Sequence, residues 1–89
     1  MMQFSWNSLK SKRLKLTRGV SFEEIIESEL VEIVDHPCRG NQRVFLFKYK
    51  NYIWEVPFVR TETEIFLKTL YPSRKYTKIY KGRMNDEKN

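Results

Sequence analysis

Cysteine is nearly absent from the 89 residues, and Cys38 is the only one. A single cysteine excludes an internal disulfide and a zinc site built from several cysteines, and it fits a reducing, cytoplasmic location. The chain also lacks a run near the ~20 apolar residues of a membrane span and the apolar segment of a signal peptide. Glycine-rich nucleotide motifs, phosphate-binding loops and HExxH motifs are missing too. We therefore expect no cofactor, no metal and no membrane partner.

The length predicts one domain, which we place at residues 1–83 with a frayed tail at 84–89. Hydrophobic residues make up 40% and aromatic residues 15% of the chain, which argues against disorder. The net charge of +6 is unevenly placed, because residues 1–20 hold five cations and no acid while residues 21–36 hold six acids and no cation. This separation indicates a basic face for a polyanion, unless the two blocks neutralise each other on the surface.

The N-terminal part predicts a short strand around Phe4 and Trp6 and then two helices. Asn7 can cap a helix over 8–18 that ends at Gly19, with Leu9 and Leu16 on its apolar face. SFEE at 21–24 is a capping box for a second helix, which also explains the acid block without catalytic carboxylates. LVEIV at 30–34 either extends this helix or forms a strand.

Residues 43–49 and 52–59 predict a hairpin closed by Lys50 and Asn51, and residues 64–71 a third strand. In that register Phe45, Phe47 and their partners share a core face. The other face is half apolar, with Val44, Leu46 and Ile53, so it is either covered by the N-terminal helices or open to a partner. His36 lies in a loop beside a proline, where histidines are more often exposed than catalytic, although its near-neutral pKa permits acid–base chemistry.

Residues 65–83 hold six Lys or Arg, four aromatic residues and no acid. Ser73 can cap a short helix that ends at Gly82, with Tyr76, Ile79 and Tyr80 facing the core and Arg74, Lys78 and Lys81 facing out. Cations with interspersed tyrosines can bind phosphates and stack a base. The same pattern also suits a terminal helix that only packs on the core and has a solvated basic face.

Cations and tyrosines can cleave RNA without a metal. The ribose 2′-OH attacks the adjacent phosphate, so the site must accept a proton, donate another to the leaving oxygen and hold the added negative charge. Arginine can hold this charge, and a lysine crowded by other cations has a lowered pKa and can transfer protons.

The sequence order FSW, NSLKSKRLKLTRGVSFEEI and FLKTLYPSRKYTKIY resembles the BrnT-type toxins of bacterial toxin–antitoxin pairs, in the RelE/ParE-like superfamily. PSRKYT replaces the SARxAT pattern of that family. Asn7 replaces an acid, and Arg18-Gly19 replaces the family's KHG turn. The resemblance implies an α+β fold with two N-terminal helices on a curved antiparallel sheet, made of a three-stranded meander and a short N-terminal strand, and a short C-terminal helix.

The resemblance further implies a metal-independent endoribonuclease that inhibits translation and is neutralised by an antitoxin. The antitoxin would be a DNA-binding ribbon-helix-helix protein, and operator DNA would be bound only through the complex. Matching positions put catalysis at Arg74, Lys75 and Tyr80, and the expected sheet register adds Lys68. RNA binding is expected at Arg43, Lys48, Tyr71 and Lys78.

Two alternatives remain open from the sequence. The basic clusters would equally serve a nucleic-acid-binding module without catalysis. ParE-like members of the superfamily act on gyrase instead of RNA, and the concentrated cations favour RNA over that target.

Overall fold

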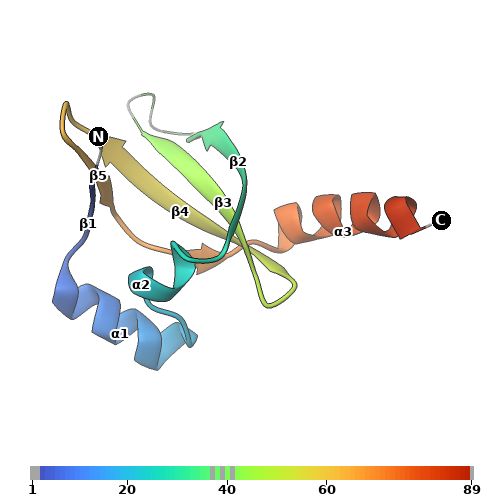
Figure 1. The fold of residues 1–89 in the computed structure, drawn as a ribbon, viewed down its shortest axis with the longest axis horizontal. Helices are drawn as coiled ribbons and strands as arrows, with labels where there is room; N and C mark the ends of the chain where they lie inside the picture. The colour runs from blue at the N-terminus through green and yellow to red at the C-terminus, as the bar shows by residue number, and fades with distance from the viewer. Residues whose placement is uncertain (1–2, 37, 39, 41, 89) are drawn as a thin grey trace.

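A mixed six-stranded sheet forms the centre of the computed structural model (Figure 1), which describes residues 3–36, 38, 40 and 42–88 and side chains as far as Lys81. The elements along the chain are β1 (Gln3–Ser5), α1 (Ser8–Arg18), α2 (Phe22–Ile25), β2 (Glu29–Asp35), β3 (Arg43–Tyr49), β4 (Tyr52–Arg60), β5 (Glu64–Leu67), β6 (Tyr71–Pro72) and α3 (Arg74–Lys88). The α+β class expected from the sequence is confirmed. No helix in the described residues is long and apolar enough to cross a membrane.

The sheet order is β1-β5-β4-β3-β2, and β6 pairs with β4 beyond the end of β5. Strands β2 to β5 form an antiparallel meander, but β1 runs parallel to β5. The purely antiparallel sheet expected from the sequence is therefore wrong. Strand β1 lies at the edge of the sheet and runs in the same direction as β5. Residues 30–34, which the sequence allowed to be helix or strand, belong to β2.

The β3–β4 hairpin has the predicted register, with Tyr49 opposite Tyr52 and Phe47 opposite Trp54. Lys50 and Asn51 form its turn with φ angles of 50° and 63°. Positive φ at both central residues suits the right-handed twist of the flanking strands, which is why two-residue hairpins favour this turn. The turn thus fixes which side chains of both strands reach each face of the sheet.

Helix α1 has the predicted ends, because the Asn7 side chain accepts a hydrogen bond from the Lys10 backbone at 2.9 Å and Gly19 adopts φ 82°. Its predicted apolar face is wrong, since Leu9 and Leu16 are 71% and 87% exposed. Leu14 and Ser11 face the core instead. The Ser11 hydroxyl donates to Glu23 and accepts from the Phe22 backbone, so a serine can be buried there without an unpaired hydrogen-bonding group.

Helix α2 has the predicted capping box, with the Ser21 hydroxyl accepting from the Glu24 backbone and the Glu24 carboxylate accepting from the Ser21 backbone. It is a single turn, however, so the arrangement with two full N-terminal helices is wrong. The chain turns after Ile25 and enters β2, where pairing with β3 outweighs the helical spacing of the residues before it.

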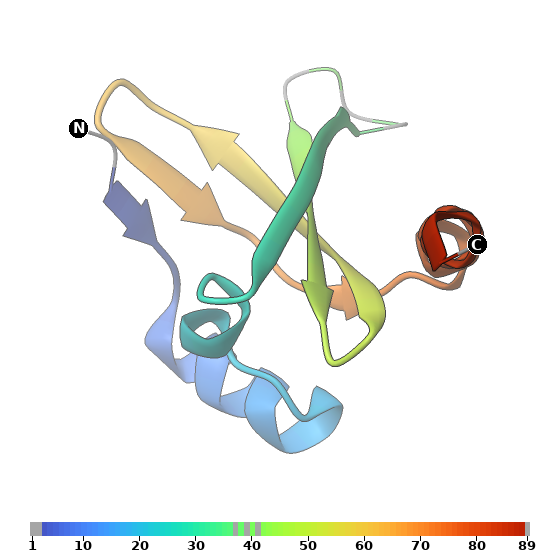
Figure 2. The same cartoon turned by 45° about the vertical axis from the view of Figure 1, so that its right-hand side comes forward.

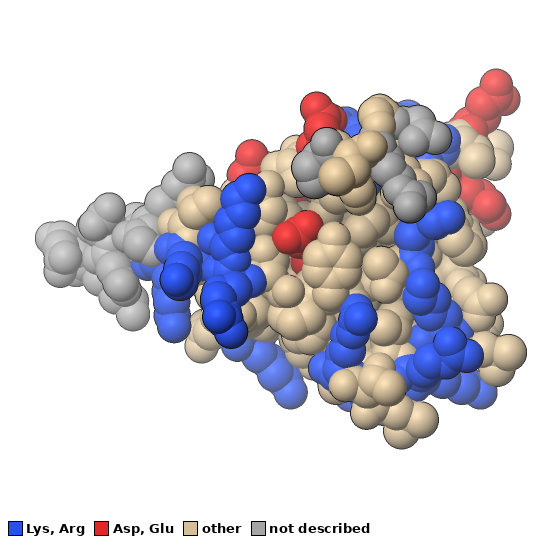
Figure 3. All heavy atoms as spheres, turned by 180° about the vertical axis from the view of Figure 1, so that it is seen from behind, with Lys and Arg blue, Asp and Glu red and all other residues tan. Residues whose placement is uncertain are grey.

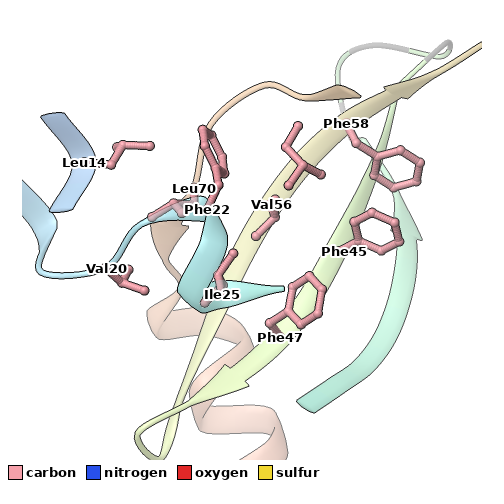
Figure 4. Packing of buried hydrophobic residues seen from close by; sticks show 10 residues of the cluster. Leu14, Val20, Phe22, Ile25, Phe45, Phe47, Val56, Phe58 and Leu70 are labelled. Atoms are coloured by element: carbon pink, nitrogen blue, oxygen red, sulfur yellow. The ribbon is translucent and has the colours of Figure 1, made fainter. Parts of the chain in front are cut away.

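The main hydrophobic core lies between the sheet and the layer of α1 and α2 (Figure 4). Its buried residues are Leu14, Val20, Phe22, Ile25, Phe45, Phe47, Val56, Phe58, Leu67 and Leu70. Phe45 and Phe58 stack with ring centroids 4.0 Å apart. The sequence placed Phe45, Phe47 and Val56 on this face, and that prediction is confirmed.

The opposite face of the sheet is covered by α3, which lies on the other side of the sheet from α1 and α2 (Figure 2). Tyr76 and Tyr80 of this helix pack on the buried residues Val44, Leu46 and Ile53. The expectation that the N-terminal helices cover this face is therefore wrong, and the apolar residues that were expected to be open to a partner are packed under α3. The last helix fills the space that the half-apolar face had left open.

The C-terminal part departs from the sequence prediction in two further ways. Regular β5 ends at Leu67, and the chain then crosses to pair as β6, held by a 2.8 Å hydrogen bond from the Lys68 backbone to the Pro57 carbonyl. Helix α3 continues past Gly82 to Lys88. Of its residues up to Lys81, Ile79 is 42% exposed and Thr77 is buried, and the Thr77 hydroxyl accepts a hydrogen bond from the Ile53 backbone.

Candidate functional site

A hollow of about 430 Å³ opens where α1, the β2–β3 loop, β4 and the β5–β6 connection meet. We call it the lysine–tyrosine hollow, and its lining comprises Lys10, His36, Cys38, Gln42, Pro57, Lys68, Thr69 and Tyr71. Pro57 is four residues beyond Ile53 on β4, so the two share the sheet face on which α3 packs. The hollow therefore lies on the α3 side of the sheet, beyond the small apolar cluster formed by Val44, Leu46 and Ile53.

Tyr71 is the best-defined polar group of the hollow. Its hydroxyl donates to Oε1 of Glu55 across the β4–β6 pair at 3.3 Å. Burial, followed by the negative charge and hydrogen bond of Glu55, raises the pKa of Tyr71 above its ordinary value of 10.0, with the charge of Arg18 acting in the opposite direction. The phenol carries its proton at neutral pH, as an unshifted tyrosine also does, and this proton is donated to Glu55 in the structure.

Lys68 and Lys10 bring two ammonium groups to the same hollow from different parts of the chain. The Lys68 backbone is held against β4, and its side chain is exposed. Arg18, at the end of α1, donates to the Leu70 carbonyl, which ties the helix to the β5–β6 connection. The fold thus brings cations from the N-terminal helix next to those of the C-terminal half.

His36 joins the lining from the loop that follows β2. Its Nδ1 accepts a hydrogen bond from the Cys38 backbone at 3.0 Å. In a neutral imidazole this leaves the proton on Nε2, so the ring presents a donor at its other nitrogen. The hollow therefore combines ammonium groups, a phenol and an imidazole, which together can transfer protons and stabilise negative charge.

The first turns of α3 carry a second group of cations, which we call the basic helix surface: Arg74, Lys75, Lys78 and Lys81, all exposed. Ser73 caps this helix, as predicted, by accepting from the Tyr76 backbone at 3.2 Å. Lys75 Nζ lies 5.3 Å from the centre of the Tyr76 ring. Seen from behind, Lys and Arg side chains gather on both sides of a largely uncharged central area (Figure 3). This arrangement provides a broad positive surface for a polyanion.

The predicted site residues do not form one cluster. The lining of the hollow contains Lys68 and Tyr71, whereas Arg74, Lys75 and Lys78 lie on the basic helix surface. The Tyr80 hydroxyl donates to Glu32 of β2, and its ring packs on the small apolar cluster. Tyr80 thus joins α3 to an edge strand of the sheet.

Two of the predicted RNA-binding residues lie on β3 away from the hollow. Lys48 is opposite Glu29 near the hairpin turn. Arg43 forms a 3.4 Å ion pair with Asp35 and shares the face of Phe45, which is the face covered by α1 and α2. Arg43 is therefore on the other side of the sheet from the hollow.

Sequence reasoning missed Lys10, His36, Gln42 and Glu55 as neighbours of the predicted residues. The sequence predicted Lys10 to be one of several solvated cations on a helix. Nothing in the spacing of α1 indicates that it lines the same hollow as the β5–β6 connection. Glu55 could have been found from the hairpin, because the predicted register already put it on this face, whereas Gln42 lies before the predicted strand. Within the described residues, no group of three or more His, Cys, Asp or Glu side chains is placed to hold a metal ion.

No protein-family model matches the chain, and no curated protein matches it. Among solved structures, the crystal structure of the Brucella abortus ribonuclease toxin BrnT is similar, with a TM-score of 0.55 and 12% sequence identity. The similarity covers 82% of this chain and 97% of that chain. The likeness to the BrnT fold that the sequence motifs suggested is therefore confirmed, together with the α+β class, although the expected arrangement of helices and strands is not.

Proposed function

We propose that the protein is the toxin of a toxin–antitoxin pair and that it cleaves RNA at the lysine–tyrosine hollow. The observation that carries this proposal is the meeting of Lys10, His36, Lys68 and Tyr71 in one hollow beside the basic helix surface. The fold it shares with a protein described as a ribonuclease toxin supports the same activity.

In the proposed reaction, the 2′-oxygen of a ribose attacks the adjacent phosphorus while the bond from phosphorus to the 5′-oxygen breaks. The products are a 2′,3′-cyclic phosphate and a free 5′-hydroxyl. The 2′-OH loses its proton to a base, and the leaving 5′-oxygen gains one from an acid. Negative charge grows on the phosphate oxygens in between, and nearby cations stabilise it.

Tyr71 is assigned the proton donated to the leaving oxygen, because its phenol lines the hollow and carries a proton at neutral pH. Lys68 and Lys10 are assigned the stabilisation of the phosphate. The Glu55 carboxylate, which already accepts from Tyr71, is assigned the 2′-OH proton. His36, whose Nδ1 accepts from the Cys38 backbone, offers its Nε2–H as a donor to the phosphate. No step in this scheme requires a metal ion, so activity is expected to persist in a chelator.

The basic helix surface is assigned to the RNA backbone. Arg74, Lys75 and Lys78 are exposed and lie outside the lining of the hollow, which suits phosphate binding along the strand. The sequence expectation that Arg74 and Lys75 are catalytic stays a prediction. It requires that their side chains reach the reacting phosphate when RNA is bound.

A toxin of this kind would act in the cytoplasm and be held inactive by an antitoxin. We keep the expectation that the antitoxin is a ribbon-helix-helix protein and that operator DNA is bound only by the complex.

The test is cleavage of a labelled RNA oligonucleotide by the purified chain in EDTA, compared with the same oligonucleotide carrying 2′-deoxyribose. Wild-type protein should leave 2′,3′-cyclic phosphate ends on the first and not cleave the second. Lys68→Ala should lose about two to three orders of magnitude in rate. Lys12→Ala, which removes the same charge from an exposed position of α1, should cleave like wild type.

Other results of these experiments would favour one of the two alternative functions, a nucleic-acid-binding module or a gyrase-directed toxin. Intact RNA with tight, salt-sensitive binding would make the chain a binding module. Growth arrest on expression with intact cellular RNA and altered DNA supercoiling would indicate a gyrase-directed toxin. If Arg74→Ala lost as much rate as Lys68→Ala, the reacting centre would extend onto the basic helix surface.

A further inference from the structure

The face of the sheet that packs on α1 and α2 has a second hollow, of about 210 Å³, beyond the part that the helices cover. We call it the arginine-rimmed hollow, and its lining is Ile33, Arg43, Phe45, Phe58, Arg60 and Ile65. These residues come from β2, β3, β4 and β5, so the hollow runs across the sheet. The proposed RNA chemistry uses none of them.

Its floor is apolar and rigid. Phe45 and Phe58 are buried and stacked on each other, with ring planes 12° apart. Ile33, which is 39% exposed, borders the floor, and Ile65 lines the hollow from β5. Phe4 of β1, 43% exposed, extends the apolar surface by an edge contact with Phe45 at 6.0 Å between ring centroids. Exposed apolar side chains grouped around a preformed hollow are typical of a protein-binding site.

Its rim is positive. Arg43 lies opposite Phe58, and Arg60 is two residues farther along the same strand, so both arginines project from the same face of the sheet. Both are exposed. Arg43 has Asp35 as an ion-pair partner at 3.4 Å, but the Asp35 side chain is 91% exposed, so solvent screens this pair. An incoming carboxylate can therefore bind at this rim without a costly rearrangement.

The chemistry of the hollow favours a protein segment over RNA. Base stacking needs an exposed ring face, whereas the floor rings are buried and face each other. An aliphatic or aromatic side chain fits the apolar floor, and neighbouring carboxylates match two arginines whose planar forks favour such groups.

We propose that the arginine-rimmed hollow binds an acidic segment of a partner protein, with one apolar side chain on the Phe45–Phe58 floor and flanking carboxylates on Arg43 and Arg60. The surface lies on the opposite side of the sheet from the lysine–tyrosine hollow. Partner binding and RNA cleavage are therefore assigned to separate residues, and this inference holds whether or not the chain cleaves RNA.

The experiment is a selection of short random peptides on the immobilised wild-type chain, with counter-selection on the double variant Arg43→Gln/Arg60→Gln. Enriched peptides should share an aliphatic or aromatic residue flanked by Asp or Glu. Their affinity should fall about tenfold in Arg60→Gln, the size expected for one charge-assisted contact. The control Lys75→Gln/Lys78→Gln removes two charges on the other side of the sheet and should bind them like wild type.

Far-ultraviolet circular dichroism checks that each variant is folded. The proposal is overturned if no peptide is enriched, if the enriched peptides are basic or lack acids, or if both double variants weaken binding equally. If an RNA oligonucleotide displaced the peptides, and if its own binding were lost in Arg60→Gln, the hollow would be a nucleic-acid site. Self-association of the chain that is lost in Arg60→Gln would make a second copy the occupant.

Discussion

The two faces of the sheet are built in different ways. The face toward α1 and α2 carries a continuous core with four phenylalanines, Phe22, Phe45, Phe47 and Phe58. Among the residues whose side chains are described, the face toward α3 has a buried apolar cluster of Val44, Leu46 and Ile53 beneath two half-buried tyrosines. Hydrogen bonds also hold α3 there, including those that join Ser73 and Thr77 to the Ile53 backbone at 2.8 Å each.

The difference between the two faces suggests that residues on one face mainly stabilise the fold and that those on the other mainly carry out the proposed chemistry. Burial of apolar area is the largest favourable term in folding, and most of it lies on the α1–α2 side. The α3 side has less apolar burial, but it carries Tyr71, Glu55 and the cations around the lysine–tyrosine hollow. Substitutions on the first side should therefore change the free energy of unfolding, and those on the second should mainly change activity.

The largest effect is expected for Phe22→Ala. Phe22 is fully buried between α2 and the sheet, so the change leaves a cavity and should reduce the free energy of unfolding by about 3–5 kcal/mol. Tyr76→Ala, the matched change on the half-buried α3 side, should cost about half as much or less, because it removes less buried area. Urea unfolding of both variants measures the difference, and equal costs would contradict the division between the two faces.

The second effect concerns activity. Tyr71→Phe removes the proposed proton donor and should lower the rate of RNA cleavage by about a hundredfold. The ring stays in place, so the free energy of unfolding should change by less than about 1 kcal/mol. Tyr52→Phe, at the hairpin turn, is the matched control and should cleave like wild type. A Tyr71→Phe protein with full activity would remove Tyr71 from the mechanism.

Local rules accounted for much of the fold. The caps at Asn7 and Gly19, the capping box at Ser21 and the hairpin turn all follow from side chains that bond their own backbone or tolerate positive φ. Such features depend on neighbours in sequence and can be recognised without knowledge of the rest of the chain. The cross-strand partners of β3 and β4 followed from the turn alone.

Long-range packing explains the errors. Leu9 and Leu16 have helical spacing, but the core side of α1 was decided by Ser11, whose hydroxyl bonds two groups in the next segment. The capping box predicted where α2 begins, whereas its end depends on β2 pairing with β3. The candidate site was found only in part, because Lys10 and His36 reach Lys68 and Tyr71 through tertiary structure.

The third effect tests how α3 is held. The Thr77 hydroxyl accepts a buried hydrogen bond from the Ile53 backbone at 2.8 Å. Thr77→Val keeps the shape but leaves that N–H without a partner, and it should cost about 1–3 kcal/mol. Thr77→Ser keeps the hydroxyl and should restore most of the loss. Hydrogen exchange of the Ile53 amide should accelerate in Thr77→Val alone. If Thr77→Val left the free energy of unfolding unchanged, Tyr76 and Tyr80 would hold α3 without this bond.

The smallest expected effects are changes in the free energy of unfolding at acid and at alkaline pH. Hydrogen bonds from Lys15 and the Ser21 backbone lower the pKa of Glu24 from 4.5 to about 2. This contribution to stability is present above the unfolded value of 4.5 and is lost as the pH falls toward 2. Glu24→Gln should therefore lose less stability over this interval than wild type. Glu62→Gln, in the exposed turn before β5, should lose as much as wild type.

The α3 side should respond at the alkaline end, because Tyr71 has a pKa raised above 10.0 by burial. Its contribution is present below the unfolded pKa of 10.0 and is lost as the pH rises through the higher folded value. Unfolding measured against pH should thus show an acid loss that Glu24→Gln reduces and an alkaline loss that Tyr71→Phe reduces. If either variant changed both ends, the two faces would be energetically coupled through the sheet, and the assignment of stability to one face and chemistry to the other would not hold.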